Sequence, residues 1–307
     1  MFHLFHNVTE YLFPEQDFAI IGIGRFGEWW KWENSGSGSY GQVFKVKDNE
    51  TGENVAIKKI VWPSSETKQN RIIQEVAILK LLSENGGHEN IAKFVKAFKY
   101  SSNITDVFIA MEYCSGGELL TYIEQHRRNE ITMHELSVKK VIKEVLSALV
   151  YSHAKGIAHL DIKPENVLFT QPPNIIFTQP PIASFYKYFP SIKLIDWGLS
   201  SRFVDFKSCP TTCPKKGTPN YAAPEIYTKN YNEKADIYSV GALMYVMVMC
   251  QFVTENPPMT EYKLNHLEMP PEGRYSTEAI VFLKKLMNFD PDKRGSAAEA
   301  LDDAWLN

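Results

Sequence analysis

Two glycine-rich strings in this chain have the spacing G-x-G-x-x-G, which suits a loop that wraps around phosphate groups. The first is Gly22–Gly27 and the second is Gly36–Gly41. Glycine has no Cβ atom, so such loops can bring backbone N–H groups close to phosphate oxygens. Because the same pattern also occurs in ordinary turns, the spacing alone does not decide between the two strings.

The residues that follow separate the two strings. The second string is followed by a strand pattern that ends on Lys58, whereas Gly22–Gly27 runs into two tryptophans and has no lysine-bearing strand at a comparable distance. A lysine on such a strand can hold the α and β phosphates of a nucleotide, and Glu75 on the next predicted helix can fix its position. Glu75 is favoured for this role because it lies among apolar residues close to the buried helix face. We therefore predict phosphate binding by Gly36, Ser37, Gly38, Ser39, Tyr40 and Gly41.

The polar stretch HLDIKPEN at residues 159–166 is the most specific pattern in the chain. It resembles the H-x-D-x-K-x-x-N catalytic loop of the eukaryotic protein kinase family. There the aspartate accepts the proton of the substrate hydroxyl, the lysine neutralises charge on the transferred phosphoryl group, and the asparagine holds a metal ion. The resemblance assigns these roles to Asp161, Lys163 and Asn166, with His159 in support. A lysine two residues after the aspartate resembles the serine/threonine branch of the family.

Further motifs follow in the order that the family has, and the resemblance covers about residues 32–307. The stretch Ile192–Gly198 resembles the metal-binding strand and turn, where Asp196 would coordinate Mg²⁺. The stretch Gly217–Glu225 resembles the end of the activation segment, where Thr218 would sit beside the catalytic loop. The resemblance also implies support from Asp236, which would brace the catalytic loop backbone, and from an ion pair between Glu225 and Arg294.

The stretch from Met111 to Cys114 resembles the linker between the two lobes of a kinase. Backbone groups of Glu112 and Cys114 would meet the adenine ring, with Met111 lining the pocket. Glu118 would reach the ribose or a basic substrate residue, and with Glu165 it forms a small acidic surface. This surface predicts a preference for arginine or lysine before the phosphorylated residue, by charge complementarity. The remaining ATP-binding residues that the resemblance implies are Val43, Ala56 and Leu168.

The elements that must position these residues change in character along the chain. Period-two apolar patterns dominate up to about residue 113, and three- and four-residue spacings dominate beyond residue 117. Strands are predicted at 42–46, 54–58 and 107–111, and helices at 70–83, 137–156, 234–250, 276–288 and 296–304.

This order predicts an α+β fold, the bilobal protein kinase fold, with a small β-rich N-lobe and a larger α-helical C-lobe. The predicted parts are an extension of unknown role at 1–31 and a kinase domain at 32–307, divided into an N-lobe at 32–111, a hinge at 112–115, a C-lobe at 116–307 and a proline-rich inserted loop at 170–190. In that loop, Leu168–Pro173 is nearly repeated as Ile176–Pro181. The repeat is either a docking loop or a duplication without function.

Composition excludes several other classes of protein. A chain of 307 residues, 44% apolar and 22% charged, has the size for one large domain or two lobes. A net charge of −3 gives no basic surface for nucleic acid. The longest apolar run, Val240–Cys250, is far shorter than the roughly 20 residues of a membrane span, and no secretory signal is expected. Four scattered cysteines indicate reduced thiols, which predicts a cytoplasmic or nuclear protein.

The chain departs from the family pattern at two positions in the catalytic region. Leu160 stands where many kinases carry the arginine that pairs with a phosphorylated activation loop, so we expect activity without that contact. Trp197 replaces the usual phenylalanine, and we expect it to pack against Leu79, Phe94 and His159. Leu160 and the linker sequence resemble the calcium/calmodulin-dependent group, with the death-associated and myosin light chain kinase branch nearest.

Two hypotheses of different classes follow. The first is an active serine/threonine protein kinase that uses ATP and Mg²⁺ and acts on protein substrates, because every polar group of the chemistry is present. The second is a pseudokinase or scaffold that keeps the fold and acts by binding partners, which the proline-rich insertion favours.

Overall fold

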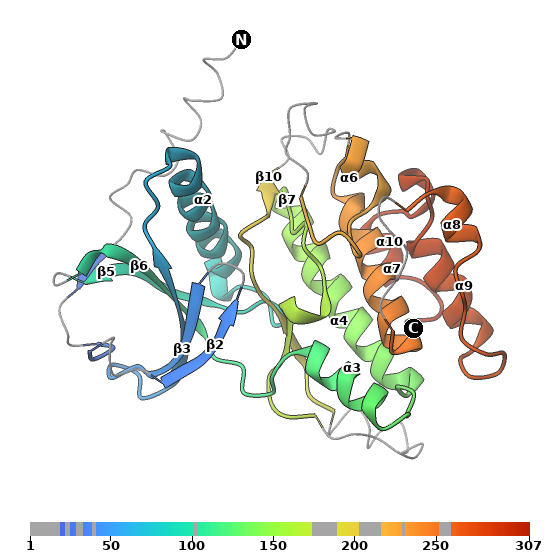
Figure 1. Cartoon of the computed structure of the whole chain (residues 1–307), viewed down its shortest axis with the longest axis horizontal. Helices are drawn as coiled ribbons and strands as arrows, with labels where there is room; N and C mark the ends of the chain where they lie inside the picture. The colour runs from blue at the N-terminus through green and yellow to red at the C-terminus, as the bar shows by residue number, and fades with distance from the viewer. Residues whose placement is uncertain are drawn as a thin grey trace, which may run out of the picture. The chain divides into compact units, whose positions relative to one another are not determined.

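The computed structural model describes residues 19–21, 25–28, 33–38, 41–100, 103–173, 189–202, 216–228, 231–251 and 259–307. The chain divides into two compact units, a small one of Met1–His88 with Ala92–Tyr113 and a large one of Glu89–Ile91 with Cys114–Asn307. The small unit is rich in strands and the large one in helices (Figure 1). The predicted α+β class is therefore confirmed.

Some sequence predictions fall outside the described residues. They concern the phosphate-loop residues Ser39 and Tyr40, most of the extension at 1–31, residues 174–188 of the inserted loop, and residues 203–215 of the activation segment.

A six-stranded sheet forms the body of the small unit, in the order β1-β5-β6-β4-β3-β2. Its strands are β1 Ala19–Ile21, β2 Glu33–Gly38, β3 Gly41–Lys47, β4 Asn54–Val61, β5 Phe94–Tyr100 and β6 Asn103–Glu112. Only β1 pairs in parallel, with β5, and the other pairs are antiparallel. A helix, α2 Glu66–Ser83, contacts β5 and is followed by a short 3₁₀ turn, η3 Glu84–Gly86.

Aromatic rings fill the core of the small unit. Phe98 is fully buried and lies at 5.0 Å from the ring of Phe26, 5.4 Å from Phe108 and 5.5 Å from Tyr100. Alternate residues of β3 and β4 join this core, because side chains of a strand point to opposite faces in turn. The hairpin between β3 and β4 turns at Gly52, whose φ of +77° suits glycine.

The described part of the first glycine string, within residues 25–28, packs against the core of the small unit, with Phe26 only 2% exposed. Arg25 makes a two-pronged ion pair with Asp48, at 3.0 Å from Nε to Oδ1 and 2.6 Å from Nη2 to Oδ2. The Tyr100 hydroxyl donates to the carbonyl oxygen of Gly27 at 2.9 Å. This part of the N-terminal extension is therefore built into the small unit.

The large unit is a helical body with two short strand pairs, β7 with β10 and β8 with β9. Its elements are α3 Leu119–Arg128, α4 Glu135–Ala154, β7 Ile157–Ala158, η4 Pro164–Asn166, β8 Val167–Phe169, β9 Ile192–Leu194, β10 Ser201–Arg202, α6 Pro224–Thr228, α7 Lys234–Met249, α8 Glu261–Asn265, α9 Thr277–Leu286, η6 Pro291–Lys293 and α10 Ala297–Leu301.

Two helices form the centre of the large unit. α4 contacts α7 and α10, and α7 also contacts α9 (Figure 1). Every residue of α7 from Ala235 to Val248 is buried, as expected for a helix that is apolar on all sides. Asp236, inside this helix, is fully buried and so needs hydrogen-bond partners. In the described part of the chain, no helix has the length and apolar character needed to cross a membrane.

Candidate active site

Lys58 and Glu75 form a buried ion pair inside the small unit. The Nζ atom of Lys58 lies 2.7 Å from Oε1 of Glu75, and the two residues are 7% and 6% exposed. Lys58 comes from β4, opposite Val43 of β3 and Ile109 of β6, while Glu75 comes from the buried face of α2. An ion pair in such a position is costly to desolvate, so a role in fixing the lysine head group accounts for it better than stability does.

The predicted phosphate loop belongs to the hairpin of β2 and β3. Gly36 pairs with Val43, Ser37 with Gln42, and Gly38 with Gly41. The register shifts between Asn34 and Gly36, at the start of the loop sequence.

The predicted adenine-contacting stretch begins at the end of β6. Ala56 of β4 pairs with Met111 of β6, so these two predicted nucleotide-binding residues are neighbours in one sheet. The backbone N–H of Glu112 donates to the carbonyl oxygen of Lys93 at 2.9 Å. That N–H group is therefore already hydrogen-bonded within the small unit. The prediction that the backbone of Glu112 contacts adenine can hold only through groups of Glu112 other than this N–H.

The predicted catalytic residues of the large unit meet in one hydrogen-bond network around Asp161. Oδ1 of Asp161 accepts from the backbone N–H of Thr218 at 2.9 Å and from its hydroxyl at 2.8 Å. Oδ2 accepts from Nδ2 of Asn166 at 3.1 Å and lies 3.1 Å from Nζ of Lys163. Lys163 also donates to the Thr218 hydroxyl oxygen at 2.9 Å. Three residues, up to 57 positions from Asp161, thus share its carboxylate.

Asp236 holds the backbone that carries this network. Its carboxylate accepts from the N–H of His159 at 2.8 Å and from the N–H of Leu160 at 2.7 Å. It also contacts Nε2 of His153 at 2.9 Å. Leu160 has a φ of +66°, which costs energy for a residue other than glycine, and the two backbone bonds hold it there.

Asp196 follows the end of β9 by two residues, and Ile195 between them is bonded to the catalytic loop. The N–H of Ile195 donates to the carbonyl oxygen of Asn166 at 2.9 Å, which ties the two segments together. Nδ2 of Asn166 donates twice to Asp161, so its Oδ1 is left as an acceptor. A carboxylate and an amide oxygen are ligands that Mg²⁺ prefers, and the pair fits the predicted metal role. The described residues contain no cluster of three or more His, Cys, Asp or Glu side chains that could hold a metal ion.

Arg294 and Glu225 pair in the interior of the large unit. Nη1 of Arg294 lies 2.5 Å from Oε1 of Glu225, and Nη2 lies 2.9 Å from Oε2. Arg294 is fully buried, stacks over Tyr238 at 5.0 Å, and donates to the carbonyl oxygens of Asn288 and Phe289. The pair therefore joins the end of the activation segment to the C-terminal part of the unit.

Similarity to known proteins shows to which family the chain belongs. Residues 30–306 match the family described as protein kinase domain. The chain belongs to the protein kinase family.

Three relatives illustrate the similarity. The chain is 31% identical to calcium-dependent protein kinase 4 of Plasmodium berghei (strain Anka), over 88% of the chain and 48% of the relative. It is 30% identical to a probable myosin light chain kinase of Dictyostelium discoideum, over 95% of the chain and 75% of the relative. It is 31% identical to CDPK-related kinase 7 of Arabidopsis thaliana, over 88% of the chain and 44% of the relative.

The chain thus spans about half the length of the Plasmodium and Arabidopsis kinases that it matches. The predicted bilobal kinase fold, the serine/threonine type and the resemblance to the calcium/calmodulin-dependent group are confirmed by these similarities.

The kinase turn that carries Asp196 contains Trp197, which is 1% exposed. Its ring lies 4.5 Å from that of His159, as the sequence predicted. Leu79 and Phe94 belong to the small unit, so packing against them stays a prediction. The indole N–H of Trp197 has no hydrogen-bond partner among the described residues.

An acidic surface lies beside the kinase catalytic loop. Glu118 forms an isolated bridge with Leu168, and Glu165 follows Lys163 by two residues. Glu118 is an exposed residue, yet partial burial of its carboxyl group, together with the negative charges of Glu165 and Glu124, raises its pKa above the usual range. In the described part of the chain, Oε2 of Glu165 and the hydroxyl of buried Tyr221 have no hydrogen-bond partner.

Sequence reasoning missed two residues that contact this site. His153 is a buried partner of Asp236 near the end of α4, and its helical position gave no sign of a role. Lys216 bonds to Ser200 and Ser201, and it stood unnoticed just before the Gly217–Glu225 motif.

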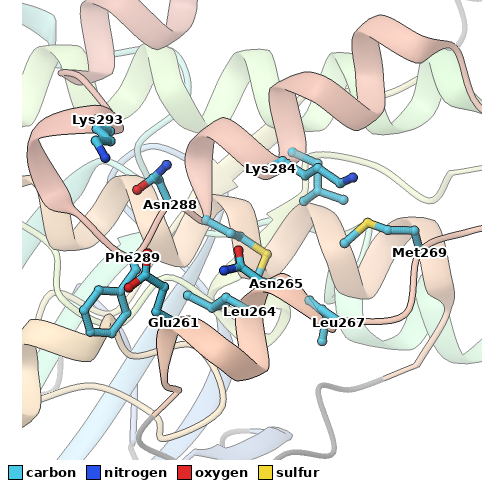
Figure 2. A pocket seen from close by; sticks show the side chains of 11 residues that line it. Glu261, Leu264, Asn265, Leu267, Met269, Lys284, Asn288, Phe289 and Lys293 are labelled. Carbon is cyan, nitrogen blue, oxygen red and sulfur yellow. The ribbon is translucent and has the colours of Figure 1, made fainter.

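A cavity of about 290 Å³ lies elsewhere in the large unit (Figure 2). It is formed by α8, the following segment, α9, the turn before η6 and η6 itself. Its polar lining comes from Glu261, Asn265, Lys284, Asn288 and Lys293. None of the predicted ATP-binding or catalytic residues contributes to it.

Proposed function

We propose that this chain is a catalytically active protein serine/threonine kinase that transfers the γ-phosphoryl group of ATP to hydroxyl groups of protein substrates. The observation that carries the proposal is the network around Asp161. Its Oδ1 already accepts a hydrogen bond from an aliphatic hydroxyl, that of Thr218, at 2.8 Å. A substrate serine or threonine hydroxyl needs the same kind of contact to deliver its proton.

The other groups have distinct tasks in this proposal. Asp161 orients the acceptor hydroxyl and takes its proton, while Lys163, 3.1 Å from the same carboxylate, offsets negative charge on the phosphoryl group. Lys58, fixed by Glu75, holds the α and β phosphates of the nucleotide. Asn166 and Asp196 would hold Mg²⁺, which supplies positive charge to the phosphate oxygens when bound. Gly36–Gly41 would contribute backbone N–H groups.

We further propose that basic residues are preferred before the phosphorylated position. Glu118 and Glu165 support this, because they place two carboxyl groups close together near the catalytic loop. A cytoplasmic or nuclear location is also proposed, supported by the four scattered cysteines of the sequence, of which Cys250 is a buried free thiol.

Incubation of the purified chain with Mg-ATP and a pool of basic peptides tests the activity. The Asp161→Asn variant should lose about 10²–10⁴-fold in phosphate incorporation, because the amide cannot accept the proton. The control is Asp302→Asn, which makes the same chemical change at an exposed residue at the end of α10 and should keep full activity. Equal incorporation by the wild-type chain and Asp161→Asn would instead support the scaffold hypothesis.

A further inference from the structure

The two ends of the activation segment are held together by one lysine. Nζ of Lys216 donates to the carbonyl oxygen of Ser200 at 3.2 Å and to the hydroxyl of Ser201 at 2.5 Å. Ser200 and Ser201 come directly after the turn that carries Asp196, and Lys216 comes two residues before Thr218. The residues between the two described ends are 203–215.

The first end is anchored to the catalytic loop region. Ser201 and Arg202 form β10 and pair with Ala158 and Ile157 of β7. The Ser200 hydroxyl donates to the carbonyl oxygen of His159 at 3.3 Å, and Ser200 is only 3% exposed. Lys216 is therefore bonded to a fixed part of the large unit.

The second end of the activation segment, residues 216–218, reaches the hydrogen-bond network around Asp161. Thr218 bonds to Asp161 through its N–H and its hydroxyl. Gly217, with a φ of +87°, lies so close to Leu160 that an added Cβ atom would be 2.8 Å from the Leu160 carbonyl oxygen. Small movements of residues 216–218 would thus change the geometry around Asp161.

Kinases with an arginine before the catalytic aspartate can hold the activation segment through a phosphate group on it. Leu160 cannot make such a contact, and it is 4% exposed. A lysine ammonium that donates to a carbonyl and a hydroxyl supplies a comparable constraint without modification, since charge-assisted hydrogen bonds are among the strong ones.

We propose that Lys216 is a positioning residue that fastens the end of the activation segment to Ser200 and Ser201 and thereby keeps Thr218 on Asp161. This inference rests on the proposed kinase activity. It extends that proposal by naming the contact that replaces a phosphate clamp.

The test combines kinetics with amide hydrogen exchange on the full chain. In Lys216→Met, kcat/KM for a peptide substrate should fall about tenfold, as expected for the loss of charge-assisted hydrogen bonds. KM for ATP should stay within about twofold, because Ser200 and Ser201, which accept the hydrogen bonds of Lys216, are not among the predicted ATP-binding residues. Exchange at residues 216–222 should become faster. Lys216→Arg should restore most of the activity, because a guanidinium can donate to the same two oxygens.

Two further variants sharpen the test. Lys284→Met removes an exposed lysine of α9 in the same unit and should change neither readout. Ser201→Ala removes one acceptor, and its effect should be absent when Lys216 is already methionine, because groups in one contact are not additive.

The outcomes are distinct. Slower peptide phosphorylation with faster exchange in Lys216→Met supports the inference. If Lys216→Met behaves like Lys284→Met, the inference is wrong. Lost activity of Lys216→Met with unchanged hydrogen exchange also contradicts it, because Lys216 would then act on the substrate and not on the segment. An inactive wild-type chain would overturn the proposed function, whereas the exchange measurement needs no turnover and still decides whether Lys216 holds the segment.

Discussion

Leu160 and Asp196 have positive φ angles, +66° and +59°, although neither is glycine. Such conformations cost energy and persist only where surrounding contacts hold them. Asp236 provides these contacts for Leu160, through bonds to two successive backbone N–H groups. Strained backbone therefore occurs at the residue before the proposed base and at the proposed metal ligand itself, and it also occurs outside the site, at Asn85, Glu130 and Cys250.

Gly217→Ala should impair activity more than stability alone explains. The Cβ atom would meet the Leu160 carbonyl oxygen at 2.8 Å and would also disfavour a φ of +87°. We expect a loss of about 1–3 kcal/mol in unfolding free energy and at least about a tenfold loss in kcat. Urea unfolding and steady-state kinetics measure the two effects.

Gly273→Ala is the matched control, because Gly273 has a φ of +78° and nothing within 4 Å of its added Cβ. Gly273→Ala should lower the unfolding free energy by only about 1 kcal/mol, because alanine disfavours this backbone conformation, and it should leave kcat unchanged. If the two variants have the same kcat, the close approach of Gly217 to Leu160 has no catalytic importance.

Glu118 should make the preference for basic peptides depend on pH. Partial burial and then the charges of Glu165 and Glu124 raise its pKa, so its negative charge disappears at a higher pH than that of an ordinary glutamate. The ratio of kcat/KM for an arginine-containing peptide to that for its alanine analogue should fall as pH decreases from 7.5 towards the raised pKa. Glu118→Gln should have a lower ratio at neutral pH and a flatter pH profile. An unchanged profile in that variant would remove Glu118 from substrate recognition.

At this site, sequence motifs predicted which side chains matter but not all of their contacts. Asp161, Lys163 and Asn166 stand within one short stretch, so their spacing alone placed them together. Lys216 could not be predicted, because its acceptors are one backbone oxygen and one ordinary serine, and neither has a sequence signature.

Among the elements, β1 has the least sequence signal and yet closes the edge of the sheet next to β5. It has three residues, too few for an apolar alternation, and its parallel partner lies far along the chain. Most of the longer elements were predicted within a few residues, whereas α3 and β5 were not predicted. α2 begins at Glu66 and not at residue 70, because its first turn is polar and adds no apolar period. α4 spans Glu135–Ala154, and Gly156, the last residue of the predicted helix, lies just beyond it at a φ of +72°.

The segment around Phe26 should be important for the stability of the small unit. Phe26→Ala removes a ring that is 2% exposed and stacked on Phe98, and such truncations cost about 3–5 kcal/mol. Urea unfolding with a probe in the small unit measures the loss. Phe289→Ala, at a residue that is 41% exposed, should cost much less. Equal effects at the two positions would show that the N-terminal segment contributes no more than a surface residue.

At the scale of the whole molecule, the polar groups of the proposed chemistry are divided between the two units. Lys58 and Glu75 belong to the small unit, and Asp161, Asn166 and Asp196 to the large one. The ion pair of Lys58 with Glu75 lies within the small unit, and the hydrogen-bond network around Asp161 lies within the large unit.

Replacement of Ser208, Thr211 and Thr212 together by alanine should leave activity largely intact. These residues lie outside the described part of the chain, and the prediction rests on Leu160, which cannot pair with a phosphorylated loop. Phosphate incorporation into a peptide, within about threefold of wild type, would agree with the absence of a phosphate switch. A folded but inactive triple variant would contradict it, and circular dichroism provides the control for folding.

The parallel pairing of β1 with β5 also has a consequence during synthesis on the ribosome. Phe98, the partner of Ala19, is made 79 positions later. At translation rates of about 5–20 residues per second, roughly 4–16 s pass between the synthesis of β1 and Phe26 and the synthesis of their partners in β5. In that interval the nascent chain exposes the ring of Phe26, which the finished protein buries and stacks on Phe98 of β5.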